Sequence, residues 1–131
     1  MLIVREGFHL LDSTPILVGA GQFTDRQTNP ELAHSPMGIA AEAAKAALAD
    51  TGIGHELAAE IDTLAVVRIF QDSYKKPRVT ASNGRAENPP RAVARRIGAN
   101  PANAIYSNVG GNTPQKLVNE MAQRISSGDV S

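Results

Sequence analysis

The chain has 131 residues, which is enough for one small domain. Its 13 basic residues balance its 13 acidic residues, so bulk charge indicates neither a nucleic-acid partner nor an acidic membrane surface. Cysteine is absent, which excludes disulfides and thiolate metal sites, and Arg5, Glu6 and His9 interrupt the apolar N-terminus, so we expect a cytoplasmic protein without a signal peptide or membrane span.

The first third of the chain is expected to hold an extension, a strand and a helix. Residues 1–14 form the extension, residues 15–19 have the apolar pattern of a buried strand, and residues 23–34 are polar and predict a loop. Ser35 is a good N-cap for the following helix, and Gly52 ends it. The stripe that we expect to face the core comprises Met37, Ala40, Ala41, Ala44 and Leu48.

The middle of the chain predicts a second strand and a basic region. A helical turn at residues 55–60 precedes the strand, which covers residues 63–67. Residues 68–96 carry an excess of basic side chains, which could meet the phosphates of a ligand, face a partner subunit or simply be solvated. The basic residues are Arg68, Lys75, Lys76, Arg78, Arg85, Arg91, Arg95 and Arg96.

The last third predicts a helix, a strand, a glycine turn and a second helix. Asn88 and two prolines open the first helix, which Gly98 closes, and residues 104–106 form the strand. Thr113 is expected to cap the final helix, and Gly128 to end it. Its apolar face comprises Leu117, Val118, Met121, Ala122 and Ile125.

Strands and helices therefore alternate along the chain. This order predicts an α/β fold with three parallel strands, residues 16–19, 63–67 and 104–106, and with the second strand in the middle.

The turn after the third strand resembles the nucleophile segment of thiolases, the acetyl-CoA acetyltransferase-like family. Val109 and Gly111 match residues that flank the family's catalytic cysteine, Asn108 lies one residue from the family's asparagine, and the ending at residues 127–129 is similar as well. Gly110 stands at the cysteine position. The run from Gly110 to Gln115 is similar to the divergent branch related to sterol-carrier-protein-type thiolases, which often lacks that cysteine.

The resemblance covers about residues 14–131 in consistent order and implies that residues 15–131 form the N-terminal part of the first thiolase-like half-domain. It implies an incomplete sheet with strand order 3-2-1, to which the remainder of a thiolase-like chain would add. The family's activity is acyl transfer in lipid metabolism, so coenzyme A or acyl-CoA is the implied ligand and no covalently bound cofactor is expected. A homo-oligomer is compatible with the resemblance, and no nucleic acid or membrane span is implied.

The resemblance places the substrate-binding residues in the glycine turn, and no catalytic residue is expected there. The expected binding residues are Val109, Gly110, Gly111, Asn112 and Thr113. Glycines at this turn allow a thioester carbonyl to approach backbone donors at a helix N-terminus, yet they equally suit a tight strand-to-helix connection. Whether the protein is an enzyme stays open. The alternative is a non-catalytic α/β interaction or acyl-CoA-binding module that retains only the fold.

Three other sites are weakly indicated. The Gly19-x-Gly21 pair after a strand is an incomplete dinucleotide-binding motif. Ser107 and Thr113 are hydroxyl groups without a nearby histidine to activate them. His9, His34 and His55 share no spacing typical of metal ligands.

Overall fold

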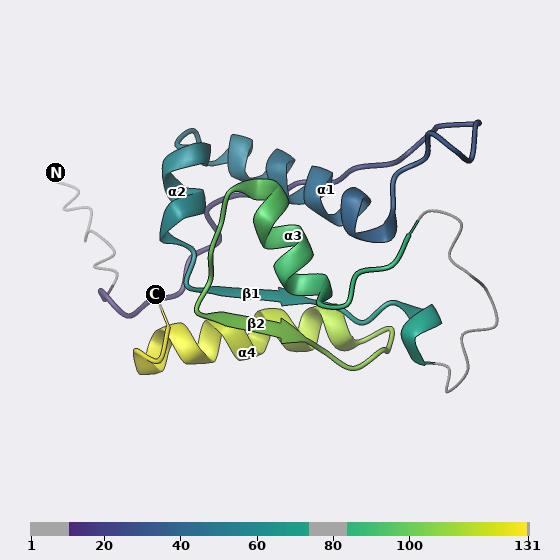
Figure 1. Cartoon of the computed structure of the whole chain (residues 1–131). Coiled ribbons are helices and arrows are strands. Elements are labelled where there is room, and N and C mark those ends of the chain that lie inside the picture. The colour runs from purple at the N-terminus through teal and green to yellow at the C-terminus, as the bar shows by residue number, and fades with distance from the viewer. Residues whose placement is uncertain (1–10, 74–83, 131) are drawn as a thin grey trace, which may run out of the picture.

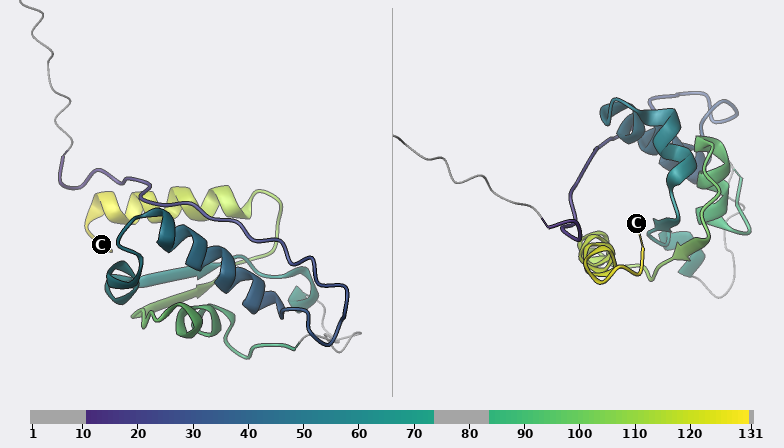
Figure 2. Two further views of the ribbon diagram at one scale, coloured as in Figure 1. Left: turned by 90° about the horizontal axis from the view of Figure 1, so that it is seen from above. Right: turned by 90° about the vertical axis from the view of Figure 1, so that its left-hand side faces the viewer.

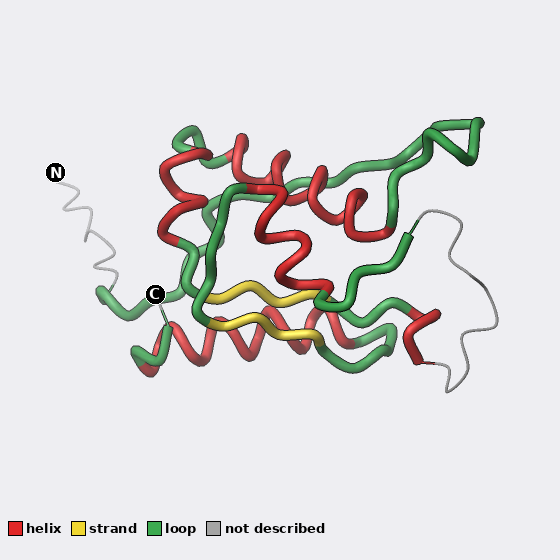
Figure 3. The backbone as a smooth tube through the Cα atoms, viewed as in Figure 1, coloured by secondary structure: helices red, strands yellow, loops and turns green. Residues whose placement is uncertain are grey.

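The computed structural model describes residues 11–73 and 84–130. Four α-helices, one 3-10 turn and two strands make up this part of the chain (Figures 1 and 3). In chain order they are α1 (Pro36–Asp50), α2 (Gly54–Glu60), β1 (Thr63–Val66), η1 (Phe70–Ser73), α3 (Pro89–Ile97), β2 (Asn103–Tyr106) and α4 (Thr113–Ser127).

The two strands form a parallel sheet, as the sequence predicts. Thr63 lies opposite Asn103 and Val66 lies opposite Tyr106. The ladder continues past both strands, because the Ser107 amide donates to the Val66 carbonyl at 3.0 Å. Helix α3 connects the strands, so β1, α3 and β2 form a crossover unit in which both strands end at the same edge of the sheet.

The predicted first strand is wrong for this structure. In the described ranges the sheet has two strands, β1 and β2. Residues 16–19 run alongside α1 and do not join the sheet, so the strand predicted at residues 63–67 is not the middle strand of three. The Ala20 amide donates to the Asp50 carboxylate at the end of α1, at 3.0 Å. Ile16, Leu17 and Val18 are 64%, 88% and 55% exposed. An apolar run predicts burial, but a strand also requires a paired neighbour.

Glycine explains why this segment lies so close to α1. A Cβ atom on Gly19 would stand 2.4 Å from the Ala47 carbonyl oxygen, and one on Gly21 would stand 2.3 Å from the Ala47 nitrogen. Any larger residue would clash with helix backbone. The Gly-x-Gly pair therefore packs a chain segment against a helix, and no helix begins directly after it as a dinucleotide site requires.

The core lies between α1, α3 and the sheet. Its buried members are Met37, Ala41, Ala92 and Val93, against which Leu64 and Val66 of β1 pack. The alanines let the two helices approach closely, and the predicted core-facing stripe of α1 is confirmed except for Leu48, which is half-buried and not part of this core. Figures 1 and 2 show α1 and α3 on one side of the strands and α4 on the other.

The helix ends follow the predicted signals in all but one case. The Ser35 hydroxyl accepts a hydrogen bond from Gly38, and the Asn88 side chain accepts one from Arg91. Gly98 and Gly128 adopt left-handed conformations with φ near 79° and 77°. The predicted Thr113 cap is wrong, because Asn112 occupies the cap position of α4 and its side chain makes no capping bond.

Helix α4 is less covered than its apolar pattern predicts. Val118 is 61% exposed, and the other apolar side chains of that face are only partly buried. None of the helices in the described ranges is long and apolar enough to cross a membrane.

Candidate functional site

The glycine turn connects β2 to α4 at the carboxyl edge of the sheet. In open α/β sheets this edge is where ligands usually bind. Because the five predicted binding residues are consecutive, the turn holds them together. Val109 is 40% exposed, Gly111 and Asn112 are exposed, and Thr113 is 8% exposed. The Thr113 amide closes the turn by donating to the Gly110 carbonyl at 3.1 Å.

Gly110 lies close to the side-chain oxygen atoms of Asn112 and Thr113. A Cβ atom at this position would stand 3.0 Å from the Thr113 hydroxyl and 3.2 Å from the Asn112 amide oxygen. Gly110 does not adopt a positive φ, so its backbone suits any residue. Glycine here leaves space next to the helix N-terminus and is not needed for the turn conformation.

Several amide groups around Gly110 are free to bind a ligand. Within residues 11–73 and 84–130, the N–H groups of Gly111, Asn112 and Gln115 have no acceptor. Such groups are the usual unsatisfied donors of a helix N-terminus, where they favour negative charge. The turn can thus donate to an oxygen atom that carries partial negative charge.

The hydroxyl groups of Ser107 and Thr113 lie at the two ends of the turn. The Ser107 hydroxyl donates to the Asn108 carbonyl at 2.9 Å. His34 lies in the loop before α1, where its Nδ1 pairs with the Asp25 carboxylate at 3.0 Å. Backbone hydrogen bonds from His34 and Gln27, and then this side-chain contact, lower the pKa of Asp25. In the described part of the chain, no three His, Asp or Glu side chains are grouped as a metal would need.

A hydrogen-bonded network joins the end of β2, directly before the turn, to residues 68–72, and the sequence did not predict it. The Tyr106 hydroxyl donates to the Asp72 carboxylate at 2.6 Å and accepts from the Ile69 amide at 3.1 Å. The guanidinium of Arg68 lies over the Tyr106 ring, 5.3 Å from its centroid, and its Nε donates to the Ser107 carbonyl at 3.2 Å. Burial and, secondly, the Asp72 carboxylate raise the pKa of Tyr106.

One signal could have revealed this network. Arg68 follows the first described strand closely and Tyr106 ends the second, and parallel strands bring such positions to one edge. Asp72 extends the network to the basic region, since its carboxylate also pairs with Arg85 at 3.0 Å.

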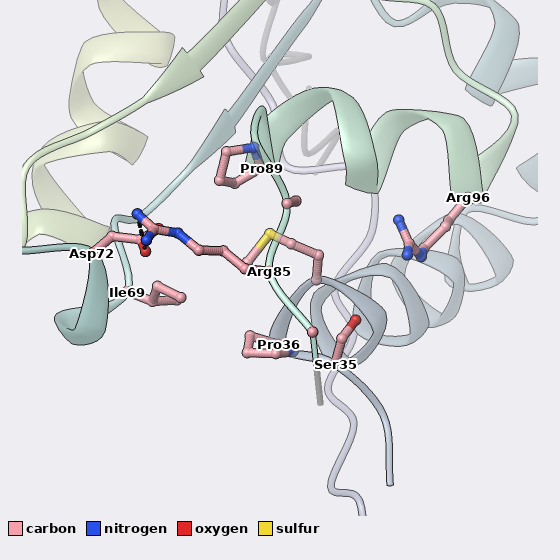
Figure 4. Close-up of a pocket in the computed structure, with 10 residues that line it drawn as sticks. Ser35, Pro36, Ile69, Asp72, Arg85, Pro89 and Arg96 are labelled. Atoms are coloured by element: carbon pink, nitrogen blue, oxygen red, sulfur yellow. Dashed lines mark ion pairs between the residues drawn. The ribbon is translucent and has the colours of Figure 1, made fainter. Parts of the chain in front are cut away.

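Two adjoining hollows share Asp72 and Arg85. The smaller, about 210 Å³, lies between the start of α1 and α3, where Figure 4 shows Arg85 reaching toward Asp72 and Arg96 entering from the other side. The larger, about 530 Å³, also includes Arg68 and Tyr106. Its two arginines are balanced by Asp72 and Glu87, so its charge selects neither an anion nor a cation.

Two arginines of the basic region, the half-buried Arg91 and the exposed Arg96, bond to backbone carbonyl groups. Arg91 donates to the Pro101 carbonyl at 3.0 Å and Arg96 to the Ala92 carbonyl at 2.7 Å, so both stabilise α3 and its connection to β2. Arg95 is exposed. Lys75, Lys76 and Arg78 lie outside the described residues.

The sequence matches no protein-family model, and a search of curated proteins gives no match. A similar solved structure is that of a monomeric SCP2-thiolase like protein type 1 from Mycobacterium smegmatis, with a TM-score of 0.70 and 38% identity over 91% of this chain. The chain spans 22% of the length of that protein.

The described part of the chain is therefore a partial thiolase-like fold of the α/β class. The likeness is to the SCP2-thiolase-like proteins in particular, which confirms the resemblance found in the sequence.

Proposed function

We propose that this chain contributes the ligand-facing turn of a thiolase-like acyl-CoA protein and that it binds acyl-CoA without the family's cysteine chemistry. The single observation behind this proposal is the place of Gly110, the residue that the sequence resemblance aligns with the family's cysteine, between the end of β2 and the free amides before α4. The relation to an SCP2-thiolase-like protein supports the choice of ligand class.

The proposed contacts follow from the donors at the turn. A thioester carbonyl oxygen would accept from free amides such as that of Asn112, the cap of α4, and that of Gly111, the residue before the cap. Gly110 leaves room for the carbonyl carbon to approach, because no Cβ fills the space below Thr113. The turn would therefore orient and polarise the thioester, while attack on it needs a nucleophile from elsewhere.

Calorimetric titration of the protein with CoA and with acetyl-CoA tests this proposal. We expect saturable binding that Gly110→Val weakens, because its branched side chain fills the space beside Thr113. Gly52→Val is a poor control because Gly52 has a positive φ, so Ala46→Val on the exposed side of α1 serves as the matched variant. No binding of either ligand by the wild-type protein would refute the proposed function.

A second candidate function is a non-catalytic interaction module that retains only the fold. The exposed apolar side chains favour it: Ile16, Leu17 and Val18 lie on one segment, and Val118 projects from α4. Such groups commonly mark surfaces that another protein covers. Absence of CoA binding together with concentration-dependent self-association would favour this second function over the first.

A further inference from the structure

Two hydrogen bonds, one from the backbone and one from a side chain, hold Ser107, the residue before the glycine turn. Ser107 uses its amide to donate to Val66 at 3.0 Å, and its carbonyl accepts from Nε of Arg68 at 3.2 Å. Both backbone polar groups of Ser107 are thus engaged. The orientation of the peptide between Ser107 and Asn108 follows, because that peptide is planar and includes the Ser107 carbonyl.

Arg68 is itself held in place from a second direction. Its guanidinium lies over the Tyr106 ring at 5.3 Å, so the planar group is fixed both by stacking and by its hydrogen bond. The ring in turn cannot shift freely, because the Tyr106 hydroxyl bonds to Ile69 and Asp72. Asp72 has a side chain only 9% exposed and is also paired with Arg85.

We propose that Arg68 is a positioning residue for the glycine turn, residues 108–112, and that it sets the direction of the free amides at the start of α4. The turn is short and anchored at both ends, by Ser107 and by the bond from Thr113 to Gly110. Changing the first peptide therefore redirects the amides that follow. The proposal deepens the proposed function, since these are the donors assigned to the thioester carbonyl.

The competing explanation is that the network only ties η1 to the end of β2. The two explanations differ in which residues respond to loss of Arg68. A tie between η1 and the sheet rests on Tyr106 and Asp72, and it persists when Arg68 is replaced. A positioning role requires a response in the turn itself.

The first test reads the turn directly, without ligand. In the 15N-correlation spectrum of the protein, Arg68→Gln should displace the amide resonances of Gly110 and Gly111. It should also raise the exchange rate of the Thr113 amide about tenfold, the lower end of what a hydrogen bond from a charged donor contributes. Arg95→Gln, which removes an exposed arginine from α3, should leave these signals in place.

Unchanged Gly110 and Gly111 resonances in folded Arg68→Gln would overturn the proposal. Should that variant not fold, Arg68→Met keeps most of the aliphatic stem and is read by the same criterion.

Titration with acetyl-CoA then separates this proposal from the function on which it rests. When the wild type binds acetyl-CoA, Arg68→Gln should weaken the Kd about tenfold relative to Arg26→Gln, which changes an exposed arginine outside the basic region, and an unchanged Kd would overturn the positioning role. A wild type that binds neither acetyl-CoA nor CoA overturns the proposed function, and the resonance test then decides the positioning role alone.

Discussion

Replacing Gly21 by alanine should loosen the segment that lies along α1. The added Cβ would stand 2.3 Å from the Ala47 nitrogen, 2.5 Å from the Ala43 carbonyl oxygen and 2.8 Å from the Ala46 carbonyl carbon. All three are backbone atoms of α1, so no side-chain rotation can relieve the clash. Either the helix shifts or the segment moves away.

The expected loss of stability follows from these two responses. Forcing an extra carbon into a packed contact typically costs about 1–3 kcal/mol. Moving the segment away instead gives up the bond from Ala20 to the Asp50 carboxylate, worth about 1.5 kcal/mol at this exposed position, along with its packing on the helix. The cheaper response limits the effect, so we expect Gly21→Ala to lower the free energy of unfolding by roughly 1–2 kcal/mol.

Urea denaturation followed by circular dichroism measures this change, and Gly111→Ala is the matched control. A Cβ on Gly111 meets nothing within 4 Å, and its φ is not positive. Alanine there should be neutral or should stabilise by up to about 1 kcal/mol, because it restricts the unfolded chain. Equal stability of the two variants would show that residues 19–21 do not rest on α1.

Three further predictions concern the glycine turn and its network. Gly110→Cys introduces the only thiol, and the pH dependence of its alkylation by iodoacetamide should give a thiol pKa below the usual value of about 8.5. The control Ser127→Cys, at the opposite end of α4, should not show this lowering. A pKa at or above about 8.5 for the Gly110→Cys thiol contradicts an anion-stabilising turn. After incubation with acetyl-CoA, peptide mass mapping should find residues 109–115 unmodified, and an adduct on Thr113 would reveal a hydroxyl nucleophile. The pKa of Tyr106 is raised above 10.0, so the contribution of its neutral hydroxyl to stability is complete below pH 10 and is lost as pH rises further. The wild type should therefore lose more free energy of unfolding in alkali than Tyr106→Phe. Parallel profiles of unfolding free energy against pH for the two proteins would refute this.

Local signals determined the features that the sequence predicts well. The caps at Ser35 and Asn88 involve residues three positions apart, and the left-handed helix ends at Gly98 and Gly128 need only glycine. The parallel pairing of β1 and β2 also follows from the helix between them.

The features that the sequence did not predict depend on contacts between residues far apart in the chain. Residues 16–19 have the composition of a strand, yet their contact with α1 depends on how closely Gly19 and Gly21 fit the helix backbone. The bond from Arg68 to Ser107 spans 39 positions and exists only because the ends of two parallel strands meet. A charged residue after a strand does not reveal such a partner on its own.

The outer edges of the two-stranded sheet affect how the protein behaves in concentrated solution. Neither β1 nor β2 contains the proline, lysine or arginine that commonly protects an edge strand, and each strand has one side without a neighbour in the described part of the chain. Their unpaired backbone groups can add a strand from another copy. Solutions of this chain on its own should therefore aggregate as concentration rises, and a cosolvent that competes for backbone hydrogen bonds should slow that growth.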